Sequence, residues 1–248
     1  MAVLPLYDSF VPFYPLLDPL EDHCEEGSEF GEVLRRHRPS ASSMLELGSG
    51  AGHGAHFMKA DFERVVLSDL APAMLRASEQ LNPDCEHVLG DMRTLRLDER
   101  FDCVFAHDAI CHMTTLEELR AAMTTAFVHL VPGGVALFVP DAIEDTFVES
   151  HDVQAAEQDG KALRALSWSW DPMPGDGQQQ VDYALMLREN GEVRCVHETH
   201  RFGLFSHAQW IALLEEVGFV PITEKHTLPP GYEGSGFSDR MYVGLRRE

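Results

Sequence analysis

The sequence contains few basic residues. Its 248 residues include 19 Lys and Arg against 41 Asp and Glu, which gives a formal net charge of −22 at pH 7. Such a charge repels phosphate backbones, and no run of Lys or Arg offers a surface for nucleic acid or an anionic membrane. We therefore expect neither nucleic acid nor a membrane among the partners of this protein.

Cysteine pairs and long apolar stretches are also lacking. The five cysteines are scattered, odd in number and without a C-x-x-C pair, which argues against a disulfide framework. No apolar run approaches the ~20 residues of a membrane-spanning helix, and the first residues lack the basic segment of a secretion signal. We expect a cytoplasmic protein. Its 44% hydrophobic residues suffice for one α/β domain with a small elaboration.

The most informative segment runs from Ser42 to Gly54 and reads SSMLELGSGAGHG. Met44 to Leu47 predicts a buried parallel strand, and the glycines that follow let the backbone turn tightly and lie against a ligand. Glycine spacing alone leaves the cofactor open, because Gly50, Gly52 and Ala55 also satisfy the G-x-G-x-x-A variant of the dinucleotide fingerprint. A NAD-dependent oxidoreductase is therefore one candidate function.

An acid follows the next predicted strand. Arg64 to Ser68 predicts a second strand, which ends in Asp69. A carboxylate there would accept two O–H donors in a bidentate fashion, and an acid about 20 residues past the glycines binds ribose in dinucleotide folds. The alternative role of Asp69 is a helix cap. Phe101 to His107 predicts a fourth strand, and Leu130 to Phe138 predicts a helix exit and a fifth strand.

Together these segments resemble the class I S-adenosylmethionine-dependent methyltransferases. The pattern E-x-G-x-G-x-G from Glu46 is similar to their motif I, the residues after Asp69 resemble their D-x-S-x-x-M-L segment, and Val88 to Met92 resembles their adenine-binding segment. The resemblance implies S-adenosylmethionine as the cofactor, with Glu46 at the methionine amino group, Asp69 at the ribose and Asp91 at the adenine. The implied cofactor-binding residues are Glu46, Gly48, Ser49, Gly50, Gly52, Asp69, Leu70, Met74, Gly90, Asp91, Met92 and His107.

The alternation of strands and helices predicts an α/β fold. We expect a doubly wound, mostly parallel seven-stranded sheet with a small antiparallel β insertion after strand five. The expected parts are an N-terminal lid or helical segment (1–40), a cofactor-binding core (41–140), an inserted β layer on the acceptor side (141–204), and a C-terminal helix with the last strands of the core (205–248).

Individual elements are predicted from periodicity and from turn residues. Helices are expected at 21–38, 52–60, 72–81, 116–130 and 206–217, the last capped by Ser206 and stopped by Gly218. In the insertion, 141–160 is expected to be irregular or helical, followed by strands at 162–170, 179–188 and 193–202, with a tight turn at Asn190-Gly191. The last strands are expected at 219–226 and 240–247, and loops at 172–177 and 229–236.

Less specifically, the whole chain resembles a small-molecule branch of these methyltransferases that includes aminosugar N,N-dimethyltransferases. The resemblance rests on Tyr7-Asp8, Gly90-Asp91-Met92-Arg93, Ile110-Cys111-His112-Met113, Glu198-Thr199-His200-Arg201 with Leu204-Phe205, and Arg240-Met241-Tyr242-Val243-Gly244. It implies an acceptor between the β layer and the cofactor, with His112 near the acceptor amine and an N-terminal tyrosine, taken here as Tyr14, near the methyl group. The chain departs from the branch at Cys111, where a glycine is usual, and in an N-terminal segment without the basic residues that help to hold the methionine carboxylate.

Methyl transfer is an in-line displacement at a sulfonium, so proximity and alignment matter most. A base is needed only if the acceptor arrives protonated, and imidazole suits that role near neutral pH. His112 and Tyr14 are therefore the expected catalytic residues, although His112 could instead be a loop histidine bonded to backbone. His107 is expected to line the pocket. Trp168 and Trp170 form either hydrophobic core or a wall of the acceptor pocket.

No metal site is expected. A dense group of possible ligands comprises Cys103, His107, Asp108, Cys111 and His112. On a strand, however, Cys103 and His107 lie too far apart to chelate one ion easily. The sequence H-E-T-H from His197 departs from H-E-x-x-H, and its two histidines would point to opposite faces of a strand.

The sequence thus predicts transfer of a methyl group from S-adenosylmethionine to a small-molecule acceptor, an amine, by a monomer or homodimer. Two alternatives stay open. One is the NAD-dependent oxidoreductase, and the other is a non-catalytic protein that binds a partner through the inserted β layer. Asp91 favours the methyltransferase, because dinucleotide enzymes have no regular counterpart of its segment.

Overall fold

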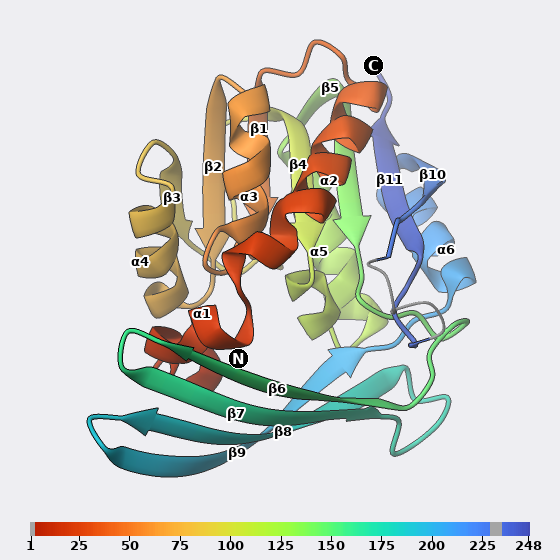
Figure 1. Ribbon diagram of the computed structural model, residues 1–248. Helices are drawn as coiled ribbons and strands as arrows, with labels where there is room; N and C mark the ends of the chain where they lie inside the picture. The colour runs from red at the N-terminus through yellow and green to blue at the C-terminus, as the bar shows by residue number, and fades with distance from the viewer. Residues whose placement is uncertain (1–2, 229–234) are drawn as a thin grey trace.

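The computed structural model describes residues 3–228 and 235–248, which form two β sheets in separate layers (Figure 1). The larger sheet has seven strands in the order β10-β11-β5-β4-β1-β2-β3, and the smaller has four in the order β6-β7-β8-β9. The expected α/β fold with an antiparallel insertion after strand five is confirmed. Within the described residues, no helix is both long enough and apolar enough to span a bilayer.

The first five strands of the large sheet are parallel. They are β1 (Ser43–Leu47), β2 (Arg64–Asp69), β3 (Glu86–Leu89), β4 (Phe101–His107) and β5 (Leu130–Val139). Of the remaining two, β11 (Arg240–Arg246) runs antiparallel beside β5, and the edge strand β10 (Phe219–Lys225) runs antiparallel to β11. Strand β1 pairs with β2 on one side and β4 on the other, so the order of the strands reverses there. The carboxyl ends of strands at such a reversal are where ligands bind in open α/β sheets.

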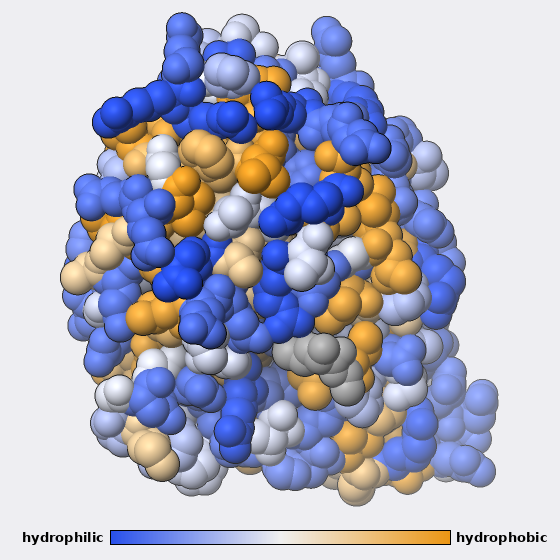
Figure 2. Space-filling model, turned by 180° about the vertical axis from the view of Figure 1, so that it is seen from behind, coloured by the Kyte–Doolittle hydropathy of each residue, from blue (hydrophilic) through white to orange (hydrophobic). Residues whose placement is uncertain are grey.

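Helices cover both faces of this sheet, and the alternation along β4 explains how. Val104 belongs to the core beneath α5 (Leu116–Val128) and α6 (His207–Val217), whereas its neighbour Phe105 belongs to the core beneath α2 (Cys24–His37) and α3 (His53–Met58). Figure 1 shows α2 in front of the sheet and α5 behind it. Helix α4 (Pro72–Leu81) follows β2 and lies beside β3. Viewed from behind, the surface is largely hydrophilic, with apolar patches between (Figure 2).

Two helix ends follow directly from the sequence. Ser206 accepts a hydrogen bond from the backbone N–H of Gln209, whose side chain in turn accepts one from the backbone N–H of Ser206. Gly218 ends α6 with a φ of 112°, a conformation in which glycine carries no Cβ penalty. Both expectations for this helix are confirmed.

The N-terminal segment lies between the two sheets. It forms short turns η1 (Pro5–Tyr7), η2 (Val11–Phe13), α1 (Tyr14–Leu17) and η3 (Leu20–His23). Leu6, Phe13 and Leu16 pack on the small sheet, whereas Tyr7 and Tyr14 pack beside Met74 of α4. The segment therefore joins the small sheet to the cofactor side of the large one. The other short turns are η4 (Lys59–Asp61) and η5 (Ala109–His112).

The small sheet is an antiparallel meander of β6 (Ser150–Gln158), β7 (Lys161–Trp170), β8 (Gln178–Glu189) and β9 (Glu192–Gly203). The hairpin turn between β8 and β9 is confirmed, since Asn190 and Gly191 have φ values of 53° and 82°. The expectation that 141–160 is irregular or helical is wrong for its second half, which is β6. This edge strand is polar and mostly exposed, so it lacks the apolar alternation that marks a half-buried strand.

Trp168 was expected either in the hydrophobic core or in a wall of the acceptor pocket, and both expectations are wrong. Its side chain is 50% exposed, and its indole N–H donates to Glu149. Ser167 and Ser169 line the cavity described below, so the alternate residues Trp168 and Trp170 point away from it. The predicted loop at 229–236 lies outside the described residues for 229–234.

Candidate active site

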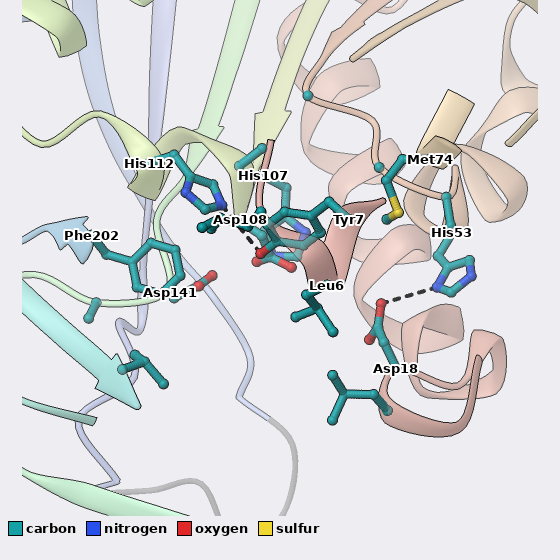
Figure 3. Close-up of a pocket in the computed structure, with 18 of the residues that line it drawn as sticks. Leu6, Tyr7, Asp18, His53, Met74, His107, Asp108, His112, Asp141 and Phe202 are labelled. Carbon is teal, nitrogen blue, oxygen red and sulfur yellow. Dashed lines mark hydrogen bonds and ion pairs between the residues drawn. The ribbon is translucent and has the colours of Figure 1, made fainter. Parts of the chain in front are cut away.

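A cavity of about 700 Å³ lies between the carboxyl ends of the parallel strands, the N-terminal segment and the small sheet (Figure 3). Of the twelve residues that the resemblance assigns to the cofactor, only Gly52 does not line it. The carbonyl of Gly52 accepts a hydrogen bond from Asn82, and an added Cβ would overlap Asn82 and Ser78. This glycine therefore permits close packing against α4, and it does not line the cavity.

The glycine loop forms a cradle that side chains would fill. Gly48 has a φ of 78°, and an added Cβ would overlap Ala109 and come 2.7 Å from the Met92 Cε. Gly50 has a φ of 55°, and its added Cβ would lie 3.5 Å from Met74. The backbone N–H groups of Gly48 and Ser49 donate to the Ser68 carbonyl at 2.7 and 2.9 Å, which fixes the loop against β2. The loop presents bare backbone to the cavity, as a cofactor at van der Waals distance requires.

Glu46 supplies a buried carboxyl group at this end of the cavity. Its side chain is 4% exposed, and its Oε2 has no hydrogen-bond partner within the described part of the chain. Burial raises the pKa of Glu46 to about 8, although the nearby His107 lowers it. A buried acceptor without a donor fits a ligand ammonium, which would supply both the hydrogen bond and the compensating charge. The methionine end of S-adenosylmethionine carries such a group.

Asp69 and Asp91 are held in different ways. Asp69 accepts hydrogen bonds from the N–H groups of Gly50 at 2.8 Å and Ala71 at 2.7 Å. Burial raises the pKa of Asp69, and these hydrogen bonds offset that rise only in part. Each of its oxygens keeps a second lone pair for a ribose hydroxyl. Asp91 pairs with Arg93, whose Nε lies 3.0 and 3.1 Å from the two carboxylate oxygens and lowers the pKa of Asp91. Arg93 also pairs with Glu118.

At the opposite end, His112 contacts Tyr7 rather than Tyr14. Its Nε2 lies 3.3 Å from the Tyr7 hydroxyl, and its ring packs edge-on against Phe202 at 4.8 Å between centroids. Burial, together with His200, lowers the pKa of His112 to about 4, so the imidazole is neutral near pH 7. Tyr14 lines the cavity at the other side, with its ring centroid 5.9 Å from that of His53. Figure 3 shows Tyr7 between His112 and the Met74 side of the cavity.

Two carboxyl groups lie beside His107, namely Asp108, which the sequence suggested only as a possible metal ligand, and Asp141, which it did not suggest. Asp108 follows β4 with a φ of 41°, and His107 Nε2 lies 2.7 Å from its Oδ1. The carboxyl groups of Asp108 and Asp141 share a hydrogen bond, so one of them carries a proton. The Asp108 side chain is 56% exposed and lines the cavity. Desolvation by the surrounding protein and the charge of Asp108 raise the pKa of Asp141, whereas His107 outweighs desolvation at Asp108 and holds the pKa of Asp108 below its usual range. The local feature that marks Asp108 as unusual is its positive φ, and a backbone angle cannot be read from the sequence.

Comparison with known proteins identifies the class of this fold and site. A family of methyltransferase domains matches residues 44–134. The chain is 28% identical over 201 residues to the dTDP-3-amino-3,4,6-trideoxy-alpha-D-glucopyranose N,N-dimethyltransferase of Streptomyces venezuelae, covering 80% of this chain and 84% of that one. It is 26% identical over 228 residues to the dTDP-3-amino-3,6-dideoxy-alpha-D-glucopyranose N,N-dimethyltransferase of Streptomyces fradiae, covering 91% and 85%.

Solved structures agree with this result. The sugar N-methyltransferase KedS8 from Streptoalloteichus sp ATCC 53650 superposes with a TM-score of 0.81 at 25% identity, over 100% of this chain and 95% of that one. The chain is therefore a class I S-adenosylmethionine-dependent methyltransferase. The oxidoreductase and the non-catalytic binding protein are set aside. The glycine cradle, the unpartnered Glu46 carboxyl and the position of Asp69 fit this cofactor.

Proposed function

We propose that the acceptor is a small polar amine of the amino sugar type, methylated at nitrogen. The observation that carries this proposal is the character of the acceptor half of the cavity. Hydroxyl and amide side chains of the small sheet line the same cavity as the Asp108–Asp141 pair, namely Ser150, Gln154, Ser167, Ser169 and Gln179. Hydroxyl and amide groups suit the hydroxyls of a sugar, and carboxyl groups suit an ammonium. The names of the relatives, which act on amino sugars, support the same class.

The cofactor residues have distinct tasks in this proposal. S-adenosylmethionine supplies a methyl group activated by its sulfonium. Glu46 binds the methionine ammonium, and Asp69 accepts hydrogen bonds from the ribose hydroxyls. Asp91 accepts a hydrogen bond from the adenine amino group, while Arg93 fixes the orientation of the Asp91 carboxylate. The remaining loop residues provide backbone contact. Catalysis then depends on the alignment of the acceptor nitrogen with the methyl carbon and sulfur.

An amine that arrives as an ammonium must lose a proton before its lone pair can attack. His112 is a weak acceptor for it, because the pKa of its imidazolium is about 4. We assign this step to the Asp108–Asp141 pair. The shared proton leaves to solvent as the ammonium enters, and the pair then accepts the proton of the ammonium. The nitrogen lone pair forms the new C–N bond as the S–C bond breaks, and S-adenosylhomocysteine leaves. His112 and Tyr7 orient the amine, and Tyr14 closes the methionine side.

A methyl-transfer assay with matched acceptors tests this function. The purified chain receives S-adenosylmethionine labelled in the methyl group and a panel of amino sugars, with and without a nucleoside diphosphate, each beside its hydroxyl analogue. We expect S-adenosylhomocysteine and a product bearing one or two added methyl groups for amines only. Equal transfer to hydroxyl analogues would overturn nitrogen as the acceptor atom. Binding of S-adenosylhomocysteine with no transfer to any amine would overturn the acceptor class.

A further inference from the structure

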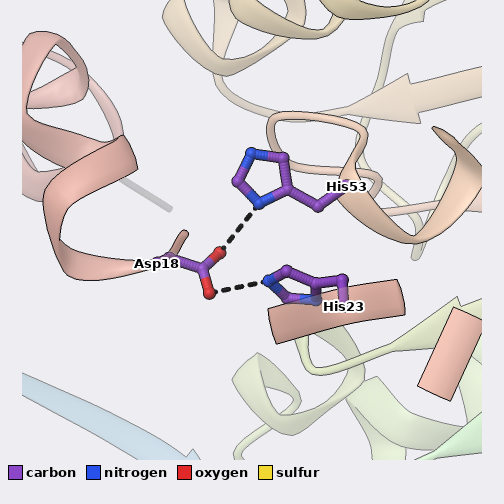
Figure 4. Close-up of side chains that lie close together, drawn as sticks. All are labelled: Asp18, His23 and His53. Carbon is purple, nitrogen blue, oxygen red and sulfur yellow. Dashed lines mark hydrogen bonds and ion pairs between the residues drawn. The ribbon is translucent and has the colours of Figure 1, made fainter. Parts of the chain in front are cut away.

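Three potential metal ligands meet at the methionine end of the cavity (Figure 4). Asp18 follows α1, His23 ends η3, and His53 begins α3 directly behind the glycine loop. His23 Nε2 lies 2.8 Å from one oxygen of Asp18, and His53 Nδ1 lies 3.3 Å from the other. One ligand atom from each of the three side chains lies within 4.8 Å of the other two. The cluster links the N-terminal segment to the loop that cradles the cofactor.

This donor set suits a borderline divalent cation. Two imidazole nitrogens and one carboxylate oxygen bind zinc at about 2.0–2.2 Å, which places ligand atoms of a tetrahedral site about 3.3 Å apart. His23 Nε2 and His53 Nδ1 lie 2.8 and 3.3 Å from the two different oxygens of Asp18, close to that separation. Glu26 Oε1 lies 2.6 Å from the other ring nitrogen of His23, the outer contact that orients histidine ligands in metal sites. The His53 side chain is only 11% exposed, and its Nδ1 makes the 3.3 Å ion-pair contact with Asp18 but no well-aligned hydrogen bond within the described part of the chain.

The charge of this end of the cavity supplies an independent argument. The methionine group carries a carboxylate as well as an ammonium, and Glu46 suits only the ammonium. Residues 1–34 contain no Lys or Arg. Arg93 is the one Arg or Lys in the described lining of the cavity, and it pairs with Asp91 and Glu118. A bound cation would supply a fixed positive charge at this end, where histidines are the only described lining side chains that can carry one without already being paired to Asp91 and Glu118.

We propose that Asp18, His23 and His53 bind one divalent cation of the zinc type, and that the cation accepts the methionine carboxylate at an open coordination position. The first half stands on the geometry of the three side chains. The second half rests on the proposed function, because it needs S-adenosylmethionine in this cavity. In either case the cation fastens the N-terminal segment to the start of α3.

Metal titration tests the first half. The full chain, freed of metal with a chelator, is titrated calorimetrically with Zn²⁺ and separately with Mg²⁺, which prefers oxygen ligands. We expect one Zn²⁺ per chain, release of protons on binding, and an affinity at least about tenfold weaker in His53→Gln and Asp18→Asn. The matched control is His197→Gln, because His197 lies 3.3 Å from Asp182 without a third ligand in the same cluster. Stoichiometric Zn²⁺ binding that survives both site variants, or no binding by the folded chain, would overturn the metal site.

Two nucleosides test the second half. S-adenosylhomocysteine carries the methionine end, and 5′-methylthioadenosine lacks it. With Zn²⁺ bound, we expect the affinity for S-adenosylhomocysteine to rise about tenfold and that for 5′-methylthioadenosine to stay unchanged. Equal behaviour of the two nucleosides would overturn the role of the cation in cofactor binding. Failure of both nucleosides to bind, with or without Zn²⁺, would contradict the proposed cofactor site and leave the metal titration standing.

Discussion

The two ends of the cavity hold their carboxyl groups by different means. At the cofactor end, Asp69 is fixed by backbone N–H groups and Asp91 by Arg93, so both have partners before a ligand arrives. At the acceptor end, Asp108 and Asp141 lie against each other, and Asp108 contacts His107. Backbone N–H donors hold a carboxylate in one position, whereas two adjacent carboxyl groups hold one proton between them. We infer that Asp69 and Asp91 serve the geometry of the cofactor end, whereas the Asp108–Asp141 pair, like the unpartnered Glu46, serves charge.

The largest expected effect breaks the geometry of the cofactor end. Gly48→Ala places a Cβ onto Ala109 in a backbone region that favours glycine, so the loop must move. We expect the affinity for S-adenosylhomocysteine to fall about a hundredfold or more. The control is Gly191→Ala, because Gly191 has a φ of 82° and nothing within 4 Å of an added Cβ. Comparable losses of affinity in the two variants would mean that backbone strain, and not crowding of the cradle, controls binding.

The second largest effect is expected from a variant that changes only the charge of the acceptor end. Asp141→Asn removes one carboxyl group of the pair and leaves the backbone donors of the cofactor loop intact. We expect kcat/KM for an amine acceptor to fall about a hundredfold, at the low end for loss of general base catalysis, with unchanged S-adenosylhomocysteine affinity. The activity of the variant should also need a higher pH, at which solvent deprotonates the acceptor. An unchanged pH profile would remove Asp141 from the proton transfer.

A smaller loss of cofactor affinity is expected when the carboxylate of Asp69 is removed. Asp69→Ala removes the acceptor of two backbone N–H groups and of the proposed ribose hydroxyls. Because charge-assisted hydrogen bonds contribute about 1.5–3 kcal/mol each, we expect cofactor affinity to fall about tenfold or more. Asp159→Ala, in the exposed turn between β6 and β7, is the control. Full affinity in a folded Asp69→Ala chain would mean that the acid only braces the loop.

The contrast between the two ends also explains what the sequence could predict. The cofactor loop is one local segment, so its strand, its glycines and the acid after β2 are visible together near positions 43–69. Likewise the alternation of strands and helices predicts the large sheet, because each element carries its own periodicity. Gly52 is the exception, since its neighbours Ser78 and Asn82 come from a later helix.

The acceptor end, and the proposed cation site at Asp18, His23 and His53, are each built from segments that are distant in the sequence and meet only in the folded chain. Tyr7 and Tyr14 are both N-terminal tyrosines, and only the packing of η1 against η5 selects Tyr7 as the partner of His112. Asp141 reaches Asp108 because β5 runs parallel to β4 and both strands end together. Asp18, His23 and His53 have no metal-binding spacing in the sequence, so the expectation of no metal site followed from spacing alone.

The smallest expected effect separates orientation from base catalysis at His112. A histidine acting as the base with its unperturbed pKa of about 6.5 would give the rate profile an acid limb near that value. The buried imidazole has a pKa of about 4, so it is neutral above that pH and is protonated only as the pH falls through it. Any limb that belongs to His112 should therefore lie near pH 4.

For His112→Asn we expect the KM of the acceptor to rise a few-fold, with kcat and cofactor affinity nearly unchanged, because the residue orients the amine without accepting its proton. The measurement is the full pH profile of kcat and kcat/KM for the parent chain and the variant. A large fall in kcat together with loss of an acid limb near pH 6.5 would make His112 the base. That result would also mean that the imidazole of His112, and not the Asp108–Asp141 pair, accepts the proton of the ammonium.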